Sequence, residues 1–466
     1  MADTHQITSA TNAGTPSDDV IVPDEIDAVT SASVRTVDDT SAPTALEHHT
    51  TAIDHGSRLG MLGHRLSNTT FHAFQTRAYR WFFASSTVSV IGFEMQGVAL
   101  GWLVYQLTHS AVALGLVTTM TAICETIFAP IGGVIADRVE RRNYIAFIRL
   151  ITLAVAIFLA VVVSLGIITY WELIVGAAFF GIGFGLNGPA RSALLAQIVD
   201  TDTLINAVSL NSGGMNLMRI LGPAAAGFLI GVINIAGIYV ILALCYVAVI
   251  LTILQVPRMP LAPHTGRRDV FGDMIGGAKY SYQHPEVFGL LLLGSVPLFF
   301  AMPYISLLPI FAERIWNVGA QGYGYLAAAP GIGGFVGALV VASMSNLKRK
   351  GRLIYISLIL YGAMLAAFAV SPDFYLGMLF LTISGGMGVA YSSTVSSIVQ
   401  MIIPNEVRGR VMSFYQMSFG ISGLSALPAS GLATLIGTPY TIALCGILVI
   451  VSAVVIFRLR PTLSHL

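Results

Sequence analysis

Long apolar runs separated by short polar breaks fill the sequence from about residue 81 onward. A helix rises 1.5 Å per residue, so a run of about 20 residues crosses a hydrocarbon core of about 30 Å. The pattern therefore predicts an all-α integral membrane protein with twelve transmembrane helices. The predicted spans are 81–107, 110–136, 143–166, 170–197, 203–233, 236–256, 286–312, 321–345, 352–371, 374–400, 408–436 and 438–458.

The longest polar interruption, residues 257–285, separates six spans from six. We therefore predict an N-terminal six-helix bundle at 71–256 and a C-terminal one at 286–460. The halves also echo each other, because the loop ending at Asp202 is matched 204 residues later by the loop ending at Glu406. Duplicated six-helix halves are a transporter architecture in which substrate binds between the repeats.

The linker between the halves has a helical pattern of its own. Val270, Met274, Ala278 and Tyr282 recur at fourfold spacing within it. This spacing predicts a short amphipathic helix that lies on the membrane surface and tethers the two halves.

Composition separates the N-terminus from the rest. Hydrophobic residues make up 55% of the chain, charged residues 10%, and the mean hydropathy is +0.78, which excludes an ordinary soluble enzyme. Ten acidic residues and one arginine give residues 1–57 a charge of −9, so the remaining 23 bases and 13 acids give +10. We expect residues 1–70 to form a disordered, acidic cytoplasmic tail, and 461–466 a short cytoplasmic C-terminus.

Orientation follows from the basic residues in short loops. Seventeen Lys and Arg residues lie on one side of the predicted spans, and only Arg314 lies on the other. The positive-inside rule then places both termini in the cytoplasm, with the chain in the bacterial plasma (inner) membrane.

Reactive side chains are sparse. Cys124, Cys245 and Cys445 lie far apart in apolar runs and do not form a disulfide framework or a metal site. The sequence has no phosphate-binding Gly-Lys-Ser/Thr loop, no Gly-x-Ser-x-Gly elbow and no folded basic domain. We expect no enzyme activity, cofactor, metal or nucleic-acid partner; the expected partners are the bilayer, protons and a small molecule, and the expected state is a monomer.

One loop motif resembles a known family. The segment Gly133-Val-Ile-Ala-Asp137-Arg138-Val-Glu140-Arg141-Arg142 is similar to the loop 2–3 signature of the major facilitator superfamily. Within that superfamily the chain resembles, over residues 70–460, the branch of enterobactin-type siderophore exporters and macrolide efflux proteins. The resemblance implies two pseudo-symmetric six-helix bundles of the major facilitator fold. The segments that carry it are Trp102–Ser110, Gly188–Leu195, Asn216–Pro223 and Glu406–Ser413.

The loop motif predicts a conformational latch. Asp137 stands at the end of a span, where its carboxylate can cap another helix and pair with Arg191 or Arg408. Such contacts hold the halves together in one state and break in the other; the alternative is ordinary positive-inside charge. Asn346 replaces the acid in the second half, which favours a one-sided latch. The latch residues are Gly133, Asp137, Arg138, Arg141, Arg142, Arg191 and Arg408.

The fifth span contains Gly222, Pro223 and Gly227, which resemble the Gly-Pro signature of antiporters in this superfamily. Proline removes a backbone donor and glycine permits close approach, so this segment is a candidate hinge. Gly-Pro pairs also occur in spans without that role.

Ionisable groups at membrane depth are candidates for function, because they are costly unless paired or hydrated. Glu94 and Glu125 are candidates for proton coupling. Arg219 and Arg149 are candidates for a counter-charge or for binding an anionic substrate. The alternative is a permanent ion pair between Arg219 and one of the glutamates.

Polar and aromatic residues within the spans are candidates for a substrate cavity, although many such residues only pack. Hydroxyl, amide, ring and thioether groups suit an amphipathic organic molecule. These residues are Gln96, Asn187, Asn211, Met215, Tyr304, Tyr391, Tyr415 and Gln416.

The leading hypothesis is a secondary active exporter of an amphipathic metabolite, such as a siderophore or antibiotic, that works by alternating access and proton antiport. One alternative is a flippase for lipids or lysophospholipids. Another is a transporter-like sensor that signals through its acidic tail.

Overall fold

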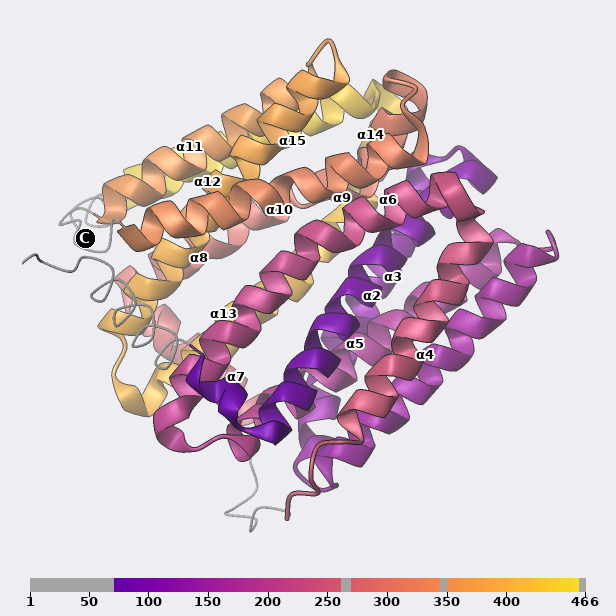
Figure 1. The fold of residues 1–466 in the computed structure, drawn as a ribbon. Helices are drawn as coiled ribbons and strands as arrows, with labels where there is room; N and C mark the ends of the chain where they lie inside the picture. Colours follow the sequence, from indigo (N-terminus) through magenta and orange to yellow (C-terminus); the bar gives the residue numbers. More distant parts are fainter. Residues whose placement is uncertain (1–70, 261–269, 344–349, 461–466) are drawn as a thin grey trace, which may run out of the picture. The chain divides into compact units, whose positions relative to one another are not determined.

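In a computed structural model of the chain, residues 71–260, 270–343 and 350–460 are described, and within these ranges the regular structure is entirely helical (Figure 1). The predicted tails, 1–70 and 461–466, and the predicted latch position Asn346 lie outside the described residues.

Five long helices form the N-terminal half, and polar residues mark where they begin. Ser110 accepts a hydrogen bond from the Ala113 amide at 3.3 Å, and Glu140 accepts one from the Asn143 amide at 3.0 Å. Such N-caps satisfy amides that have no partner within the helix. The elements are η1 (His72–Gln75), α2 (Arg77–Thr108), α3 (Ala111–Ala136), α4 (Arg141–Ser164), α5 (Tyr170–Ile198) and α6 (Thr201–Ile253).

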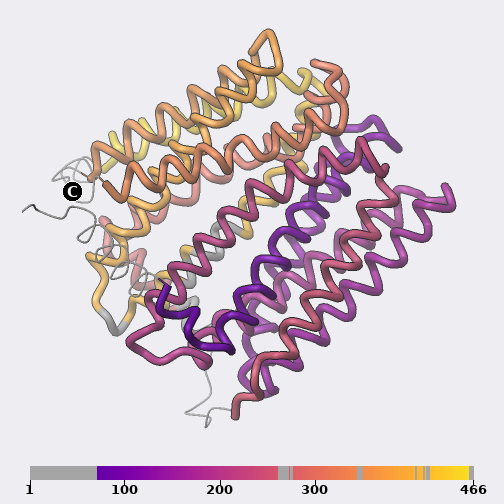
Figure 2. The backbone as a smooth tube through the Cα atoms, in the orientation of Figure 1, coloured from indigo at the N-terminus to yellow at the C-terminus, as the bar shows by residue number. Residues whose placement is uncertain are grey.

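Helix α6 contains two of the predicted spans. Its helical dihedrals are interrupted at Asn234, which has φ of 60° and accepts a hydrogen bond from the Gly237 amide at 3.2 Å. A positive φ combined with an extended ψ of 179° is incompatible with a continuing helix and is rare outside glycine. The chain reverses there, as the backbone tube shows (Figure 2), and the break predicted between 233 and 236 is confirmed.

The C-terminal half repeats this plan with more interruptions. The predicted span 286–312 is built from three pieces, because a new helix begins at Pro303 and a π-helical turn follows at Phe311. Proline cannot donate the backbone hydrogen bond that would continue the helix. The elements are α7 (Val270–Gln283), α8 (Pro285–Ala301), α9 (Pro303–Ile310), η2 (Phe311–Ile315), α10 (Gly319–Ser343), α11 (Lys350–Ala369), α12 (Phe374–Ile402), α13 (Asn405–Ser422), η3 (Gly423–Ser425), α14 (Ala426–Ile436) and α15 (Thr438–Leu459).

The described helices account for all twelve predicted spans. Ten helical segments are long and apolar enough to cross a membrane, one of them the double helix α6, and Gly420–Ile436 is a shorter apolar segment in the predicted span 408–436. The prediction of an all-α membrane protein is therefore confirmed.

Loops at the two ends of the helices differ in charge. We call the end that carries Arg138, Arg141, Arg142, Arg408 and Arg410 the basic end, and the opposite one the far end. Helices α6 and α10 converge toward the far end, near α14 (Figure 1).

Glycines bring the two halves into backbone contact at the far end. A Cβ on Gly227 of α6 would lie 2.5 Å from the Cα of Gly324 on α10. A Cβ on Gly115 of α3 would lie 2.8 Å from the Ala426 carbonyl oxygen of α14. Helices approach this closely only where side chains are absent or small. We call these two contacts the far-end seal.

Close contacts at glycines between the halves continue only to the middle of the helices. Gly331 of α10 lies against Ile220 of α6, and Gly420 of α13 lies against Thr126 of α3. Both contacts are several helical turns from the basic end.

The predicted linker helix is α7, and it packs on the first turns of α13. A Cβ on Gly277 would overlap the Arg410 carbonyl oxygen, so these backbones touch. Gly277 and Ser281 are buried, whereas Tyr282 is exposed. The side chains of Val270 and Met274 lie outside the described ones.

The far-end seal gives the first testable prediction. Gly227→Ala places a methyl group against Gly324, so we expect it to lower the free energy of unfolding by about 1–3 kcal/mol. Gly231, one turn further along α6, has nothing within 4 Å of its would-be Cβ. Gly231→Ala should leave stability unchanged or raise it by about 0.5–1 kcal/mol. Thermal unfolding of the purified variants measures both; equal shifts would contradict the seal.

Candidate functional site

Two of the predicted membrane charges form an ion pair. Arg219 Nε of α6 lies 3.7 Å from Glu94 Oε1 of α2. The helices meet closely here, because a Cβ on Gly222 would lie 2.6 Å from the Cβ of Glu94. The Arg219 side chain is 57% exposed and that of Glu94 27%, so the rest of the described chain leaves the pair partly uncovered.

A polar stripe leads from this pair toward the basic end. Ser209, Ser212, Asn216 and Arg219 are all exposed, and their spacing of three and four residues places them on one face of α6. The sequence analysis did not select the first three as cavity residues. Their helical spacing is the signal that could have identified them.

We call the exposed surface that carries Glu94, Arg219 and the polar stripe of α6 the open face. On α2, this face ends one turn beyond Glu94. Gly97 of α2 is exposed, with nothing within 4 Å of its would-be Cβ. Four residues on, a Cβ on Gly101 would lie 2.8 Å from the Tyr323 hydroxyl of α10. Tyr323 also stacks on Trp102, with 6.1 Å between ring centroids. The Glu94–Arg219 pair therefore lies just on the basic-end side of a closed contact.

Glu125 occupies a different environment from Glu94. It is half-buried on α3, and its side chain forms no ion pair with any side chain that the structure describes. Its backbone carbonyl lies against Gly185 of α5, where a Cβ would be 2.5 Å away. The two candidate carboxylates therefore differ, since only Glu94 has a cationic partner.

The other two membrane arginines do not join this pair. Arg149 is 3% exposed and lies 5.8 Å from the Tyr246 ring centroid, while Arg191 lies 5.6 Å from that of Phe82. Both are cation–π contacts within the N-terminal half. Arg149 thus contacts an aromatic ring in this conformation, and its role as a counter-charge or as a ligand for an anionic substrate stays a prediction.

The predicted latch residues make contacts within their own halves. Asp137 pairs with Arg141 at 3.4 Å across one helical turn. Arg142 donates to the Val256 carbonyl at 3.0 Å, and Arg408 donates to the Ile403 carbonyl at 3.2 Å. Arg138 is exposed, and Gly133 packs near Pro189. Among the described side chains, no ion pair joins the halves at the basic end.

The predicted hinge segment is a packing segment in this conformation. Helix α6 keeps helical dihedrals through Gly222 and Pro223, and its non-helical residue is Asn234. The Pro223 carbonyl oxygen would lie 2.6 Å from a Cβ on Gly324. A hinge function for the segment stays a prediction.

The predicted cavity residues are dispersed. Gln96, Asn187, Tyr304 and Tyr391 are nearly fully buried. Asn211 lies on α6, where its amide donates to the Met215 sulfur at 3.3 Å. The Gln416 side chain lies outside the described ones.

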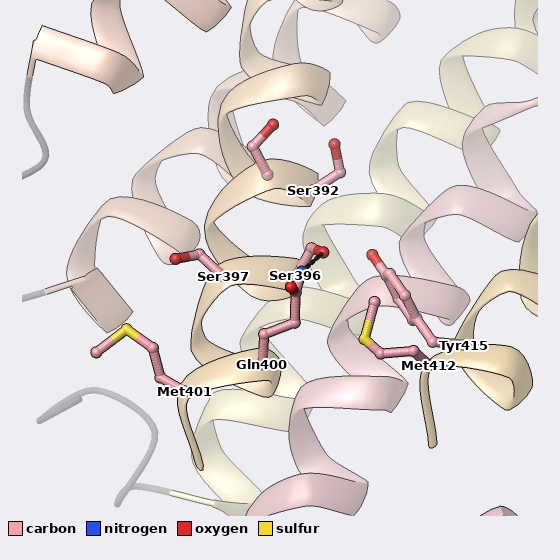
Figure 3. A pocket seen from close by; sticks show the side chains of 8 residues that line it. Ser392, Ser396, Ser397, Gln400, Met401, Met412 and Tyr415 are labelled. Atoms are coloured by element: carbon pink, nitrogen blue, oxygen red, sulfur yellow. Dashed lines mark hydrogen bonds between the residues drawn. The ribbon is translucent and has the colours of Figure 1, made fainter. Parts of the chain in front are cut away.

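Tyr415 lines a pocket of about 620 Å³ between α12 and α13 (Figure 3). All of the described residues that line this pocket come from the C-terminal half. Within the described residues, no group of three or more His, Cys, Asp or Glu side chains could hold a metal ion.

Comparison with known sequences identifies one family. Residues 68–464 match the major facilitator family described as transmembrane secretion effector. The chain is 24% identical over 401 residues to the enterobactin exporter EntS of Shigella boydii serotype 18, covering 83% of this chain and 94% of that protein. It is also 24% identical over 387 residues to the staphyloferrin A transporter of Staphylococcus aureus, covering 83% and 97%.

Solved structures show the same fold. A bacterial homologue of the human lysosomal transporter Spinster, in an inward-facing and unoccupied conformation, aligns with a TM-score of 0.65 at 14% identity, covering 83% of this chain and 97% of that one. The nucleoside transporter NupG aligns with a TM-score of 0.66 at 13% identity, covering 82% and 98%.

Thiol labelling would test where the open face ends. In a variant whose native cysteines Cys124, Cys245 and Cys445 are replaced by alanine, Gly97→Cys should react quickly with a hydrophilic maleimide. Gly101→Cys, one turn further on, should react at least about tenfold more slowly, because Tyr323 covers it. Equal labelling rates in membranes would contradict the closed contact.

Proposed function

Because the chain belongs to the transmembrane secretion effector family of the major facilitator superfamily, we propose that it exports a siderophore from the bacterial cytoplasm by proton antiport. The named relatives, an enterobactin exporter and a staphyloferrin A transporter, support a siderophore as the exported amphipathic molecule. The family is one of transporters, so the expectation that the chain is not an enzyme is confirmed.

The Glu94–Arg219 pair is the observation that carries the coupling proposal. An ionised carboxylate accepts hydrogen bonds, so Glu94 binds either a proton or a hydrogen-bond donor of the substrate, but not both at the same oxygen. Competition of this kind is what an antiporter requires. Arg219 favours the ionised form when the pair is closed, and it offers donors to substrate oxygens when the pair opens.

Glu125 is the second coupling candidate. It is half-buried on α3, with no described charged partner that would neutralise it. A carboxylate in that position is costly to keep ionised, so its protonation would respond strongly to hydration. We assign it a supporting role, because its partner would have to arrive through a change of conformation.

The different contacts at the two ends of the molecule support an alternating-access mechanism. The far-end seal closes the halves at Gly227 and Gly324 while the basic end is held by no described ion pair. In the opposite state, the seal separates and the latch forms, with Asp137 pairing across the halves with Arg408 while Arg191 supports the cluster from the N-terminal half. The basic end then faces the cytoplasm, in line with the positive-inside rule.

Efflux of the two named siderophores tests the function. A bacterium that lacks its own exporters and expresses the wild-type chain should retain several-fold less enterobactin or staphyloferrin A than cells with an empty vector. A protonophore should abolish that difference. Glu94→Gln should also abolish it, because a neutral amide cannot exchange a proton. Glu125→Gln should have a smaller effect.

Glu286→Gln is the matched control, since Glu286 is exposed in the first turn of α8 and has no described ion-pair partner. Unchanged retention of both siderophores would overturn the siderophore assignment. Protonophore-sensitive export by the Glu94→Gln variant would overturn the coupling role of Glu94 alone.

The latch makes a separate prediction. Asp137→Asn removes the acid that should hold the basic end closed, so the transport rate should fall roughly two- to tenfold, as the loss of about 0.5–1.4 kcal/mol would produce. Asp202→Asn changes an exposed acid at the same end and should transport like wild type. Equal rates for all three proteins in an initial-rate efflux assay would remove the latch from the mechanism.

A further inference from the structure

The pocket between α12 and α13 has an unusual lining for a membrane helix. Ser392, Ser393, Ser396, Ser397 and Gln400 line it from α12, and Met412 and Tyr415 face them from α13 (Figure 3). The five α12 residues recur at spacings of three and four, so they share one helical face. The described lining residues are all uncharged.

Three of the four pocket serines leave their hydroxyl donor without an acceptor among the described residues. A helical serine usually donates to a carbonyl of the preceding turn. Ser392 does so, at 3.3 Å from the Val389 carbonyl oxygen, as Ser164 does at 2.6 Å in α4. The Ser396 hydroxyl instead accepts from Gln400 Nε2 at 3.1 Å, and the hydroxyls of Ser393 and Ser397 make no hydrogen bond to any described residue. Three hydroxyl donors are therefore available to the pocket.

The pocket lies near the basic end of the C-terminal half. The serines lie in the last three turns of α12, and α12 ends at Ile402 beside the basic end. Along the helices, the pocket is therefore on the same side of the far-end seal as the Glu94–Arg219 pair. The charged pair lies on α2 and α6 in the N-terminal half, so the two sites belong to different halves.

We propose that this pocket is a second substrate subsite, which binds the oxygen acceptors of an uncharged polar arm of the exported molecule. The free hydroxyls donate to carbonyl or phenolic oxygens, the Gln400 carboxamide offers both a donor and an acceptor, and Met412 and Tyr415 contact the apolar part of that arm. This inference rests on the proposed function and assigns the two halves complementary tasks: ionic recognition in the first and neutral hydrogen bonding in the second.

Direct binding to the purified full-length protein in nanodiscs tests the subsite, with the two siderophores of the efflux assay as probes. The triple variant Ser393→Ala, Ser396→Ala and Ser397→Ala should bind at least about tenfold more weakly than wild type, since it removes three hydrogen-bond donors from the subsite. Ser164→Ala, which alters an exposed serine at the far end, should bind like wild type.

Thiol protection provides an independent readout that does not depend on a triple substitution. In the cysteine-free background, Ser396→Cys should react with a hydrophilic maleimide, and the bound siderophore should slow that reaction several-fold. The siderophore should not slow labelling of Ser164→Cys.

These experiments distinguish a failure of the subsite from a failure of the proposed function. Wild-type binding together with unchanged affinity in the triple variant, or with no protection of Ser396→Cys, overturns the subsite and leaves the proposed function in place. Failure of the wild-type protein to bind either siderophore overturns the proposed function and the subsite with it.

Discussion

Backbone contact between glycines at the far end is the constraint on which the rest of the structure depends. Gly227 and Gly324 let α6 and α10 touch where any side chain would force them apart, and Gly115 does the same for α3 and α14. Because these contacts do not extend to the basic end, the helices diverge there. That divergence leaves the polar stripe of α6 exposed and makes the Glu94–Arg219 pair reachable from one side.

The membrane environment raises the energetic cost of leaving these charged side chains without a partner. Charges at membrane depth must be paired or hydrated, and Glu94 and Arg219 are paired with each other. Arg149, about two turns into α4, is enclosed and rests on Tyr246. The same residue type therefore packs against an aromatic ring in one helix and remains exposed beside a carboxylate in another.

Much of the fold is predictable from the sequence, because hydrophobic length fixes the spans and polar residues such as Ser110 and Asn234 fix their ends. The site is only partly predictable. The sequence allows Arg219 to pair with Glu94 or with Glu125, and contacts between helices decide that Glu94 is the partner. The serine face of α12 is not predictable, since serines are common in membrane helices and their free donors become evident only from the hydrogen bonds. The glycines of the Gly222 segment serve close packing in this conformation, and a hinge function for the segment stays a prediction.

Distances between spin labels at both ends of the molecule test the central claim, that one end opens as the other closes. One pair at Arg138 and Arg352 reports the basic end, and a second pair at Leu165 and Val370 reports the far end; all four side chains are exposed. Double electron–electron resonance measures both distances on protein in nanodiscs, across pH and with or without siderophore. The distance at the basic end should shorten as the distance at the far end lengthens. Distances that stay fixed under every condition, or that change in the same direction, would contradict the account.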